Sequence, residues 1–254
     1  MGAHIVQSIA LDASLWDEPI TGIGLYTRQL HRALAGPGLE RERGGARKSG
    51  ELPRRRASRS GWTVVNLALE LARRKPRLFH ALANFNLPFS RVPGVPYVLT
   101  VHDLVPLLLP ETVSTAFRWQ FRLWLARAAT VADRIICVSE VARDSLLEHF
   151  DVDPSKVCVI HHGVDHVEQV APPDSTTVRW LDALGLPETF VLYAGSLDAR
   201  KNVGLVLKAM EQLHAQGRRA TLVLAGQRWF GSGAIEKEVL QLKERGVDVR
   251  PLGY

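Results

Sequence analysis

Two basic residues late in the sequence have the setting of an anion site. Arg200 and Lys201 follow the apolar run TFVLYAGS and stand directly before Asn202, which precedes a helix-like run. Two cations beside a helix N-terminus favour negative charge, because the unpaired N–H groups at that end point the same way. Gly195, Ser196 and Asn202 belong to the same loop and are expected to line a ligand cleft. A solvated surface pair of charges is the alternative interpretation of Arg200 and Lys201.

A second polar pair, His102 and Asp103, ends the β-branched run PYVLTV. Polar residues at the carboxyl end of a parallel strand point into the crevice where α/β proteins bind ligands. The pair is therefore predicted to lie at a ligand site. A buried pair that only caps the strand is the alternative.

Two glycines, Gly22 and Gly24, stand between the first strand-like run and a helix-like run. Glycine lets a backbone approach a ligand closely, and the helix that follows offers free N–H groups to an anion. A plain tight turn would explain the same residues, since a lone G-x-G falls far short of a nucleotide-binding fingerprint.

Four other polar residues have simpler explanations. Ser139 ends a strand-like run and Glu140 begins a helix-like run, so N-capping accounts for both. His161 and His162 are adjacent on a strand-like run, so their side chains point to opposite faces and cannot easily share one ion. No metal site is predicted.

These residues are positioned by alternating strand-like and helix-like runs, which predict an α/β fold with parallel sheets and helices on both faces. A stretch that begins with two prolines and lacks the alternation on either side of it divides the chain. We expect a first domain over 1–170, a linker over 171–187 and a second domain over 188–254. The segment 41–60 has no periodicity and is predicted to be a basic, disordered loop.

Composition excludes several classes of protein. The chain has 254 residues, of which 46% are hydrophobic and 23% charged, as in globular proteins rather than fibrous or wholly disordered ones. Two cysteines are too few for a disulfide scaffold. The apolar stretch Val95–Pro110 is interrupted by polar residues and prolines, so it is interpreted as a buried strand and the loop after it.

The net charge of +6 comes from one segment, because 41–60 holds eight basic and two acidic residues. That segment leaves open a binding module for nucleic acid or anionic lipid. Basic residues spread over a folded surface are what nucleic-acid binding usually needs, so no specific nucleic acid is expected.

Four segments taken together resemble a known family: TGIG, then VHDLVPLLLPE, then ICVSE with VIHHGVD, and then YAGSLDARKN. Their order and spacing are similar to those of the retaining GT-B glycosyltransferases of family 4. The resemblance covers nearly the whole chain except the basic segment. It implies an α/β, GT-B fold, in which two Rossmann-like doubly wound domains face a cleft, and the second domain here is incomplete.

The resemblance also implies roles for individual residues. His102 would lie next to the transferred sugar as the catalytic-site residue, with Asp103 orienting the loop. Arg200 and Lys201 would hold the donor diphosphate, and the loop of Gly22 and Gly24 would lie beside the donor phosphate and the acceptor.

The family's acidic pair, two glutamates separated by seven residues, lies late in its second domain. Glu140–Glu148 and Glu236–Glu244 have that spacing but stand too early and on helix-like runs, so both are interpreted as accidental. The sequence therefore looks cut off inside the second domain, and a weak or inactive enzyme is expected. A non-catalytic remnant or a subunit that needs a missing C-terminal half is the alternative.

The function implied is transfer of a sugar from a nucleoside-diphosphate sugar, with GDP-mannose as the suggested donor, to a hydroxyl acceptor with retention. The acceptor would be a saccharide or a lipid-linked saccharide, as in polysaccharide biosynthesis. No cofactor is implied, since the nucleotide sugar is a substrate. The start of the chain lacks the pattern of a signal peptide, so a cytoplasmic location is expected, with a peripheral contact on the inner face of an anionic membrane.

Overall fold

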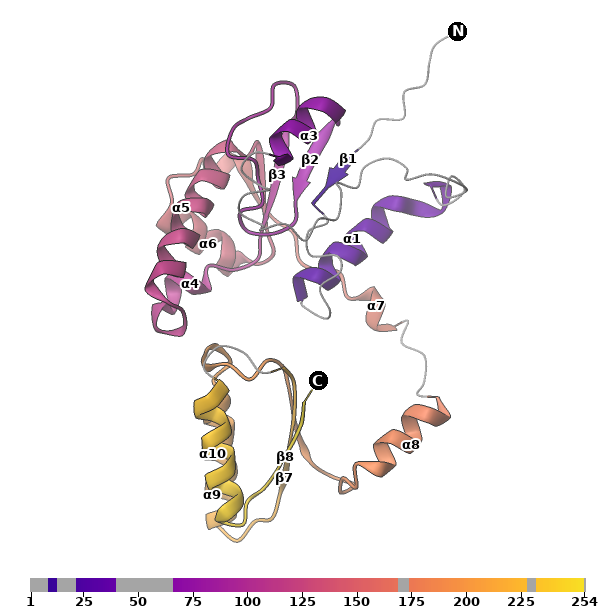
Figure 1. The fold of residues 1–254 in the computed structure, drawn as a ribbon, viewed down its shortest axis with the longest axis vertical. Coiled ribbons are helices and arrows are strands. Elements are labelled where there is room, and N and C mark those ends of the chain that lie inside the picture. The colour runs from indigo at the N-terminus through magenta and orange to yellow at the C-terminus, as the bar shows by residue number, and fades with distance from the viewer. Residues whose placement is uncertain (1–8, 13–21, 40–65, 169–173, 228–231, 254) are drawn as a thin grey trace. The chain divides into compact units, whose positions relative to one another are not determined.

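The computed structural model describes residues 9–12, 22–39, 66–168, 174–227 and 232–253. The chain separates into two compact units, each built around one parallel sheet (Figure 1). The basic loop expected over 41–60 lies outside the described residues, and so does Thr21.

The sheet of the first unit has five strands that are hydrogen-bonded in chain order and run parallel. They are β1 (Ile9–Leu11), β2 (Leu78–Ala81), β3 (Tyr97–Val101), β4 (Arg134–Cys137) and β5 (Val157–Val159). Because all five run the same way, their carboxyl ends share one edge of the sheet. That edge is where the loops bearing the predicted polar residues emerge.

Helices connect these strands. They are α1 (Gly22–Leu39), α3 (Leu67–Arg74), α4 (Val105–Leu108), α5 (Thr115–Val131), α6 (Glu140–His149) and α7 (Asp165–Glu168), with 3-10 turns η3 (Pro110–Thr112) and η4 (Pro154–Lys156).

One face of the first sheet carries the core. Its inward residues pack with α3, α5 and α6 in a single hydrophobic cluster, whose fully buried members include Leu71, Phe79, Leu99, Leu125 and Leu146. The opposite face presents His80 and Thr100, and the Tyr26 hydroxyl of α1 lies 3.2 Å from the Thr100 hydroxyl. Helices therefore lie on both faces of this sheet, as the alternation predicts.

The apolar stretch Val95–Pro110 differs in part from its interpretation. It contains β3 as expected, but the residues after the strand form the short helix α4 rather than a loop alone. The Asp103 Oδ1 accepts a hydrogen bond from the Val105 N–H at 3.2 Å, which turns the chain into that helix. Pro106 fits its first turn, where no N–H donor is needed.

The second unit has three parallel strands in the order β6-β7-β8. Its elements are α8 (Ser175–Ala183), β6 (Val191–Ala194), η5 (Ala199–Lys201), α9 (Val203–Ala215), β7 (Thr221–Ala225), α10 (Ser232–Glu244) and β8 (Asp248–Gly253). Helix α8 falls within the stretch expected to be a linker.

The core of the second unit lies between β7, β8 and the helices α9 and α10, which run side by side (Figure 1). Leu207, Leu222 and Val249 are almost fully buried there. Strand β6 is different, because Val191 and Leu192 are 43% and 56% exposed. Within the described ranges, no helix is both long and apolar enough to cross a membrane.

Candidate functional site

His102 follows β3 at the carboxyl edge of the first sheet and is half-buried. Its Nε2 lies 2.8 Å from the carbonyl oxygen of Leu82. A carbonyl oxygen can only accept, so Nε2 carries the proton and donates this bond. In the neutral ring Nδ1 is then the unprotonated nitrogen, able to accept a hydrogen bond from a hydroxyl group.

Two aromatic rings enclose the His102 imidazole. Tyr26 meets it edge-on at a centroid distance of 5.2 Å, and His162 stacks on it at 5.5 Å. Burial lowers the pKa of His102 below 6.5, and the neighbouring His162 lowers it further, while the Leu82 hydrogen bond and Asp103 act in the opposite direction. The ring is therefore neutral at pH 7.

On the face of the sheet that α1 covers, the side chains of His80, Thr100 and Tyr26 form a series of hydrogen bonds. The Thr100 hydroxyl lies 2.8 Å from His80 Nε2 and 3.2 Å from the Tyr26 hydroxyl. Burial, with a smaller contribution from His102, lowers the pKa of His80 to about 4. Burial also raises the pKa of Tyr26, so these groups stay uncharged and hydrogen-bonded near neutral pH.

Gly22 and Gly24 lie in the first turn of α1, which contains no acidic residue. Tyr26 stands one turn after Gly22 and contacts His102, so the start of this helix lies at the same edge of the sheet as the His102 loop. A Cβ added at Gly22 would meet no atom within 4 Å. The N–H groups at the start of a helix favour an anion, so Gly22 and Gly24 stay candidates for a phosphate contact.

Asp103 is exposed, and its carboxylate accepts a hydrogen bond from the Val105 N–H. The same loop is also held by Asn84, a residue absent from the sequence prediction. Asn84 Oδ1 accepts from the His102 N–H at 2.7 Å, and Asn84 Nδ2 donates to the Asp103 carbonyl at 2.9 Å.

In the second unit, the loop between β6 and α9 is organised by the buried carboxylate of Asp198, which the sequence prediction also missed. Its Oδ2 accepts from the Ser196 hydroxyl at 2.6 Å, and its Oδ1 accepts from the Lys201 N–H at 3.0 Å. The Arg200 guanidinium lies 3.5 Å from the same carboxylate and is one-third exposed. Asp198 stands three residues before Lys201, whose N–H it accepts, and this is the spacing of a capping residue. That spacing could have identified Asp198 in the sequence.

Asn202 stands at the N-cap of α9 as predicted, but its side chain makes no capping hydrogen bond. Its φ of 51° is left-handed, a conformation that asparagine tolerates better than most residues. Gly195 precedes the loop, and a Cβ at Gly226 would fall 1.7 Å from the Gly195 oxygen. Only glycine fits at position 226, because the chain at Gly195 packs directly against it. The ends of β6 and β7 therefore pack tightly beneath the loop.

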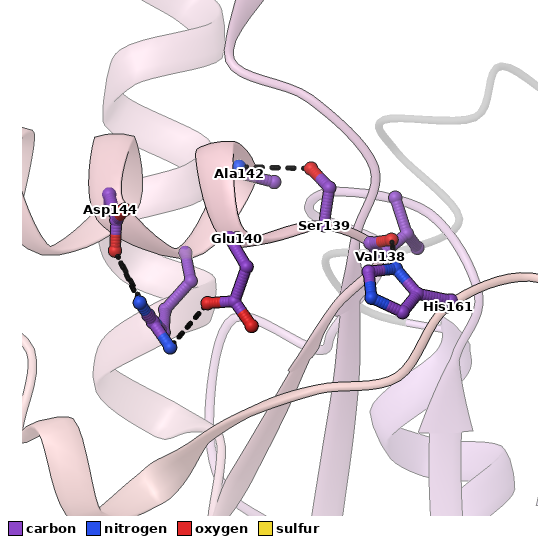
Figure 2. A network of polar contacts seen from close by, with 7 residues as sticks. Val138, Ser139, Glu140, Ala142, Asp144 and His161 are labelled. Carbon is purple, nitrogen blue, oxygen red and sulfur yellow. Dashed lines mark hydrogen bonds and ion pairs between the residues drawn. The ribbon is translucent and has the colours of Figure 1, made fainter.

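Figure 2 shows the region of Ser139. The Ser139 hydroxyl accepts from the Ala142 N–H at 3.1 Å and caps α6, which confirms the N-capping prediction. Glu140 pairs with Arg143 at 2.5 Å, and His161 Nδ1 donates to the Val138 carbonyl at 3.2 Å (Figure 2). His161 and His162 lie beyond the end of β5, not on a strand as predicted. They have different partners, because the His162 ring stacks on His102. The part of the chain that the structure describes has no group of three or more metal-ligating side chains placed to hold an ion.

The predicted residues therefore form two groups, each within its own unit. In the first unit, Gly22, Gly24 and the His102–Asp103 loop lie at the edge of one sheet. In the second unit, one loop carries Gly195, Ser196, Arg200, Lys201 and Asn202. The first group offers a neutral imidazole beside a helix start, and the second offers two cations beside another.

Known proteins are similar to this chain in sequence and in fold. A family model described as Glycosyltransferase Family 4 matches residues 20–168, more than half of the chain. The serotype-specific mannosyltransferase WbdA of Escherichia coli is 30% identical over 160 residues, 58% of this chain and 19% of that protein. A D-inositol 3-phosphate glycosyltransferase of Nocardioides sp. is 36% identical over 130 residues, 48% of this chain and 27% of that protein.

Solved structures agree on the fold. Anabaena HepE, crystallised in complex with UDP and glucose, gives a TM-score of 0.55 at 19% identity, covering 74% of this chain and 51% of that one. A glycosyltransferase from Rickettsia africae gives 0.53 at 13% identity, covering 98% and 69%. These likenesses, with the two parallel sheets, confirm the predicted α/β, GT-B fold class. The chain spans less than a third of the length of the two curated relatives named above.

Proposed function

The chain belongs to glycosyltransferase family 4, and on that premise we propose that it transfers a sugar from a nucleoside-diphosphate sugar to a hydroxyl group of an acceptor. Retention of configuration at the sugar is part of the proposal, since it is what the family resemblance implies. The nucleotide sugar is a substrate in this scheme, and no separate cofactor is invoked.

The observation that carries the proposal is the loop between β6 and α9. Arg200 and Lys201 stand together at the start of α9, with the loop fixed from inside by the Asp198 carboxylate. A diphosphate placed there would meet two positive side chains and helix N–H groups. Such charges stabilise the negative charge that develops on the leaving group during transfer, and they do so without a metal ion.

His102 would act on the sugar in this scheme. Its Nε2 proton is engaged by the Leu82 carbonyl, and burial keeps the ring neutral. The group left for substrate is the Nδ1 lone pair, which can accept a hydrogen bond from a sugar hydroxyl. A neutral acceptor of this kind orients the sugar without adding positive charge beside the reacting carbon.

For the donor we propose GDP-mannose, because the segment VHDLVPLLLPE is typical of mannosyltransferase-like members and a relative named mannosyltransferase matches 58% of the chain. UDP-glucose is the competing donor to test, since HepE was solved with UDP and glucose. A saccharide or lipid-linked acceptor, a cytoplasmic location and a contact with anionic membrane remain predictions.

A panel of nucleotide sugars tests the proposal, with thermal stabilisation and release of nucleoside diphosphate measured in parallel. We expect one donor to raise the melting temperature and, since a weak enzyme is expected, to be consumed slowly in the presence of a saccharide acceptor. Binding without any consumption would favour the non-catalytic alternative. Absence of both binding and consumption for every donor would contradict the proposed function.

A further inference from the structure

Asn84 joins two consecutive residues of the His102–Asp103 loop. Its Oδ1 accepts from the His102 N–H at 2.7 Å and its Nδ2 donates to the Asp103 carbonyl at 2.9 Å. Asn84 itself is half-buried and lies three residues after the end of β2. One side-chain amide therefore contacts both peptide groups that flank the loop.

These contacts lie where the pairing of the strands ends. β2 and β3 pair up to Ala81 and Leu99, and His102 and Asp103 lie beyond that ladder. Without the amide, the His102 N–H and the Asp103 carbonyl would lose partners that hold the backbone at a fixed angle. Because the Asn84 amide donates one hydrogen bond and accepts another, it restricts the backbone torsions of both His102 and Asp103. A single hydrogen bond would not restrict both residues.

The backbone angle matters because it sets the direction of the His102 ring. His102 Nε2 lies 2.8 Å from the Leu82 carbonyl oxygen, and this distance depends on where the backbone places the His102 Cα–Cβ bond. Leu82 belongs to the same segment as Asn84, so both ends of His102 are tied to the chain that follows β2. This segment thereby decides which nitrogen of His102 carries the proton, and so leaves Nδ1 as the unprotonated nitrogen.

We propose that Asn84 is a positioning residue for sugar transfer, which holds the His102–Asp103 backbone so that the His102 ring keeps its proton on Nε2 and offers Nδ1 to the donor sugar. The proposal rests on the proposed function, because the use of Nδ1 belongs to that scheme. The lock on the ring is a property of the folded chain and can be measured without substrate.

The first experiment reads the His102 ring directly. The full chain, labelled with ¹⁵N-histidine, is compared with Asn84→Ala and with the control Asn86→Ala, which removes an amide from the same loop whose Nδ2 donates to Asp12 at 2.7 Å. We expect a single Nε2–H form of His102 near pH 7.5 in the parent and the control. Asn84→Ala should instead show averaged signals from both neutral forms.

Folding is checked in the same spectra through His80, a buried residue of β2 whose Nε2 lies 2.8 Å from the Thr100 hydroxyl of β3. If the His80 signals of Asn84→Ala differ from those of the parent, the variant is misfolded and Asn84→Asp is used instead. A carboxylate still accepts from the His102 N–H but cannot donate to the Asp103 carbonyl. That variant should show the same loss to a smaller degree. An unchanged His102 pattern in a folded Asn84 variant would overturn the proposal.

The second experiment separates positioning from general structure. With the active donor, Asn84→Ala should lower turnover by about 10- to 100-fold, as a misplaced reacting group does. Its affinity for nucleoside diphosphate should not change, because the Asn84 side chain holds the His102–Asp103 loop, to which no diphosphate contact is assigned. Unchanged turnover would overturn the positioning role. A parent chain without transfer would count against the proposed function, while the His102 spectra still decide whether Asn84 locks the ring.

Discussion

The imidazole rings of His102 and His162 stack with their centroids 5.5 Å apart and their planes 24° apart. Two imidazolium ions at that separation would repel each other, so each ring disfavours protonation of the other. Burial remains the largest cause of the lowered pKa of His102, and His162 adds to it. The stacked pair therefore acts to keep the His102 ring neutral.

Replacing His162 with Phe tests this relationship. His162→Phe keeps an aromatic ring against His102 and removes the charge, so the pKa of His102 should rise towards its ordinary value. The measurement is an NMR titration of the His102 ring, with His149→Phe on α6 as the control. A midpoint that falls or stays where it was would show that His162 does not act through its charge.

His80 predicts a pH dependence of stability. Its pKa is about 4 in the folded chain against 6.5 for an ordinary histidine. Between these values the unfolded chain binds more protons, so stability rises with pH in this window and is lost as the pH falls from 6.5 towards 4. The loss from this group is on the order of 3 kcal/mol.

His80→Gln provides the comparison, since glutamine can still hydrogen-bond to Thr100 and does not titrate. Urea unfolding at pH 4.5 and 7.5 should show a smaller difference in the free energy of unfolding for this variant than for the parent. Some difference should persist, because His102 and His162 shift in the same direction. Equal differences in the two proteins would contradict the role assigned to His80.

Asp198→Asn should destabilise the second unit. Asp198 is 3% exposed, and its carboxylate contacts the Ser196 hydroxyl, the Arg200 guanidinium and the Lys201 N–H. Weakening one of these charge-assisted contacts should cost about 1–3 kcal/mol. Chemical unfolding measures the loss, with Asp182→Asn on the exposed surface of α8 as the matched control. A loss as small as that of the control would mean that the carboxylate does not hold the loop.

Hydrogen exchange should distinguish the two sheets. In β3, Tyr97, Leu99 and Val101 are fully buried, whereas in β6 Val191 and Leu192 are 43% and 56% exposed. Poorly buried strands open at a lower free energy, so amides of β6 should exchange faster than those of β3. Equal protection of the two strands would show that exposure does not govern opening here.

The strands and long helices were predictable because their signal is local. Strand β3 consists of apolar and β-branched residues throughout and is buried on both faces, so its composition alone identifies it. Helix α4 was missed because Val105–Leu108 is short and contains a proline. Its first turn depends on the Asp103 carboxylate, a contact that an apolar run does not reveal.

The candidate site was predictable where chemistry follows residue type and was missed where it depends on backbone groups. His102, Arg200 and Lys201 stand out as charged or polar residues after strands. Asn84 does not, because its partners are backbone groups 18 and 19 residues later, and the sequence does not indicate where those groups point. Asp198 carries a local capping signal, but its link to the Arg200 side chain appears only in the fold.

The measurement that tests the account most directly is binding of a nucleoside-diphosphate sugar by the loop of Arg200 and Lys201. Isothermal titration with GDP-mannose and UDP-glucose would compare the parent, the double variant Arg200→Ala/Lys201→Ala, and the control Lys208→Ala/Lys237→Ala, which removes equal charge from α9 and α10. We predict that the control binds as the parent does. The double variant should lose about 1.5–3 kcal/mol per contact, at least a tenfold loss of affinity. Equal affinity in the double variant and the parent would contradict the account.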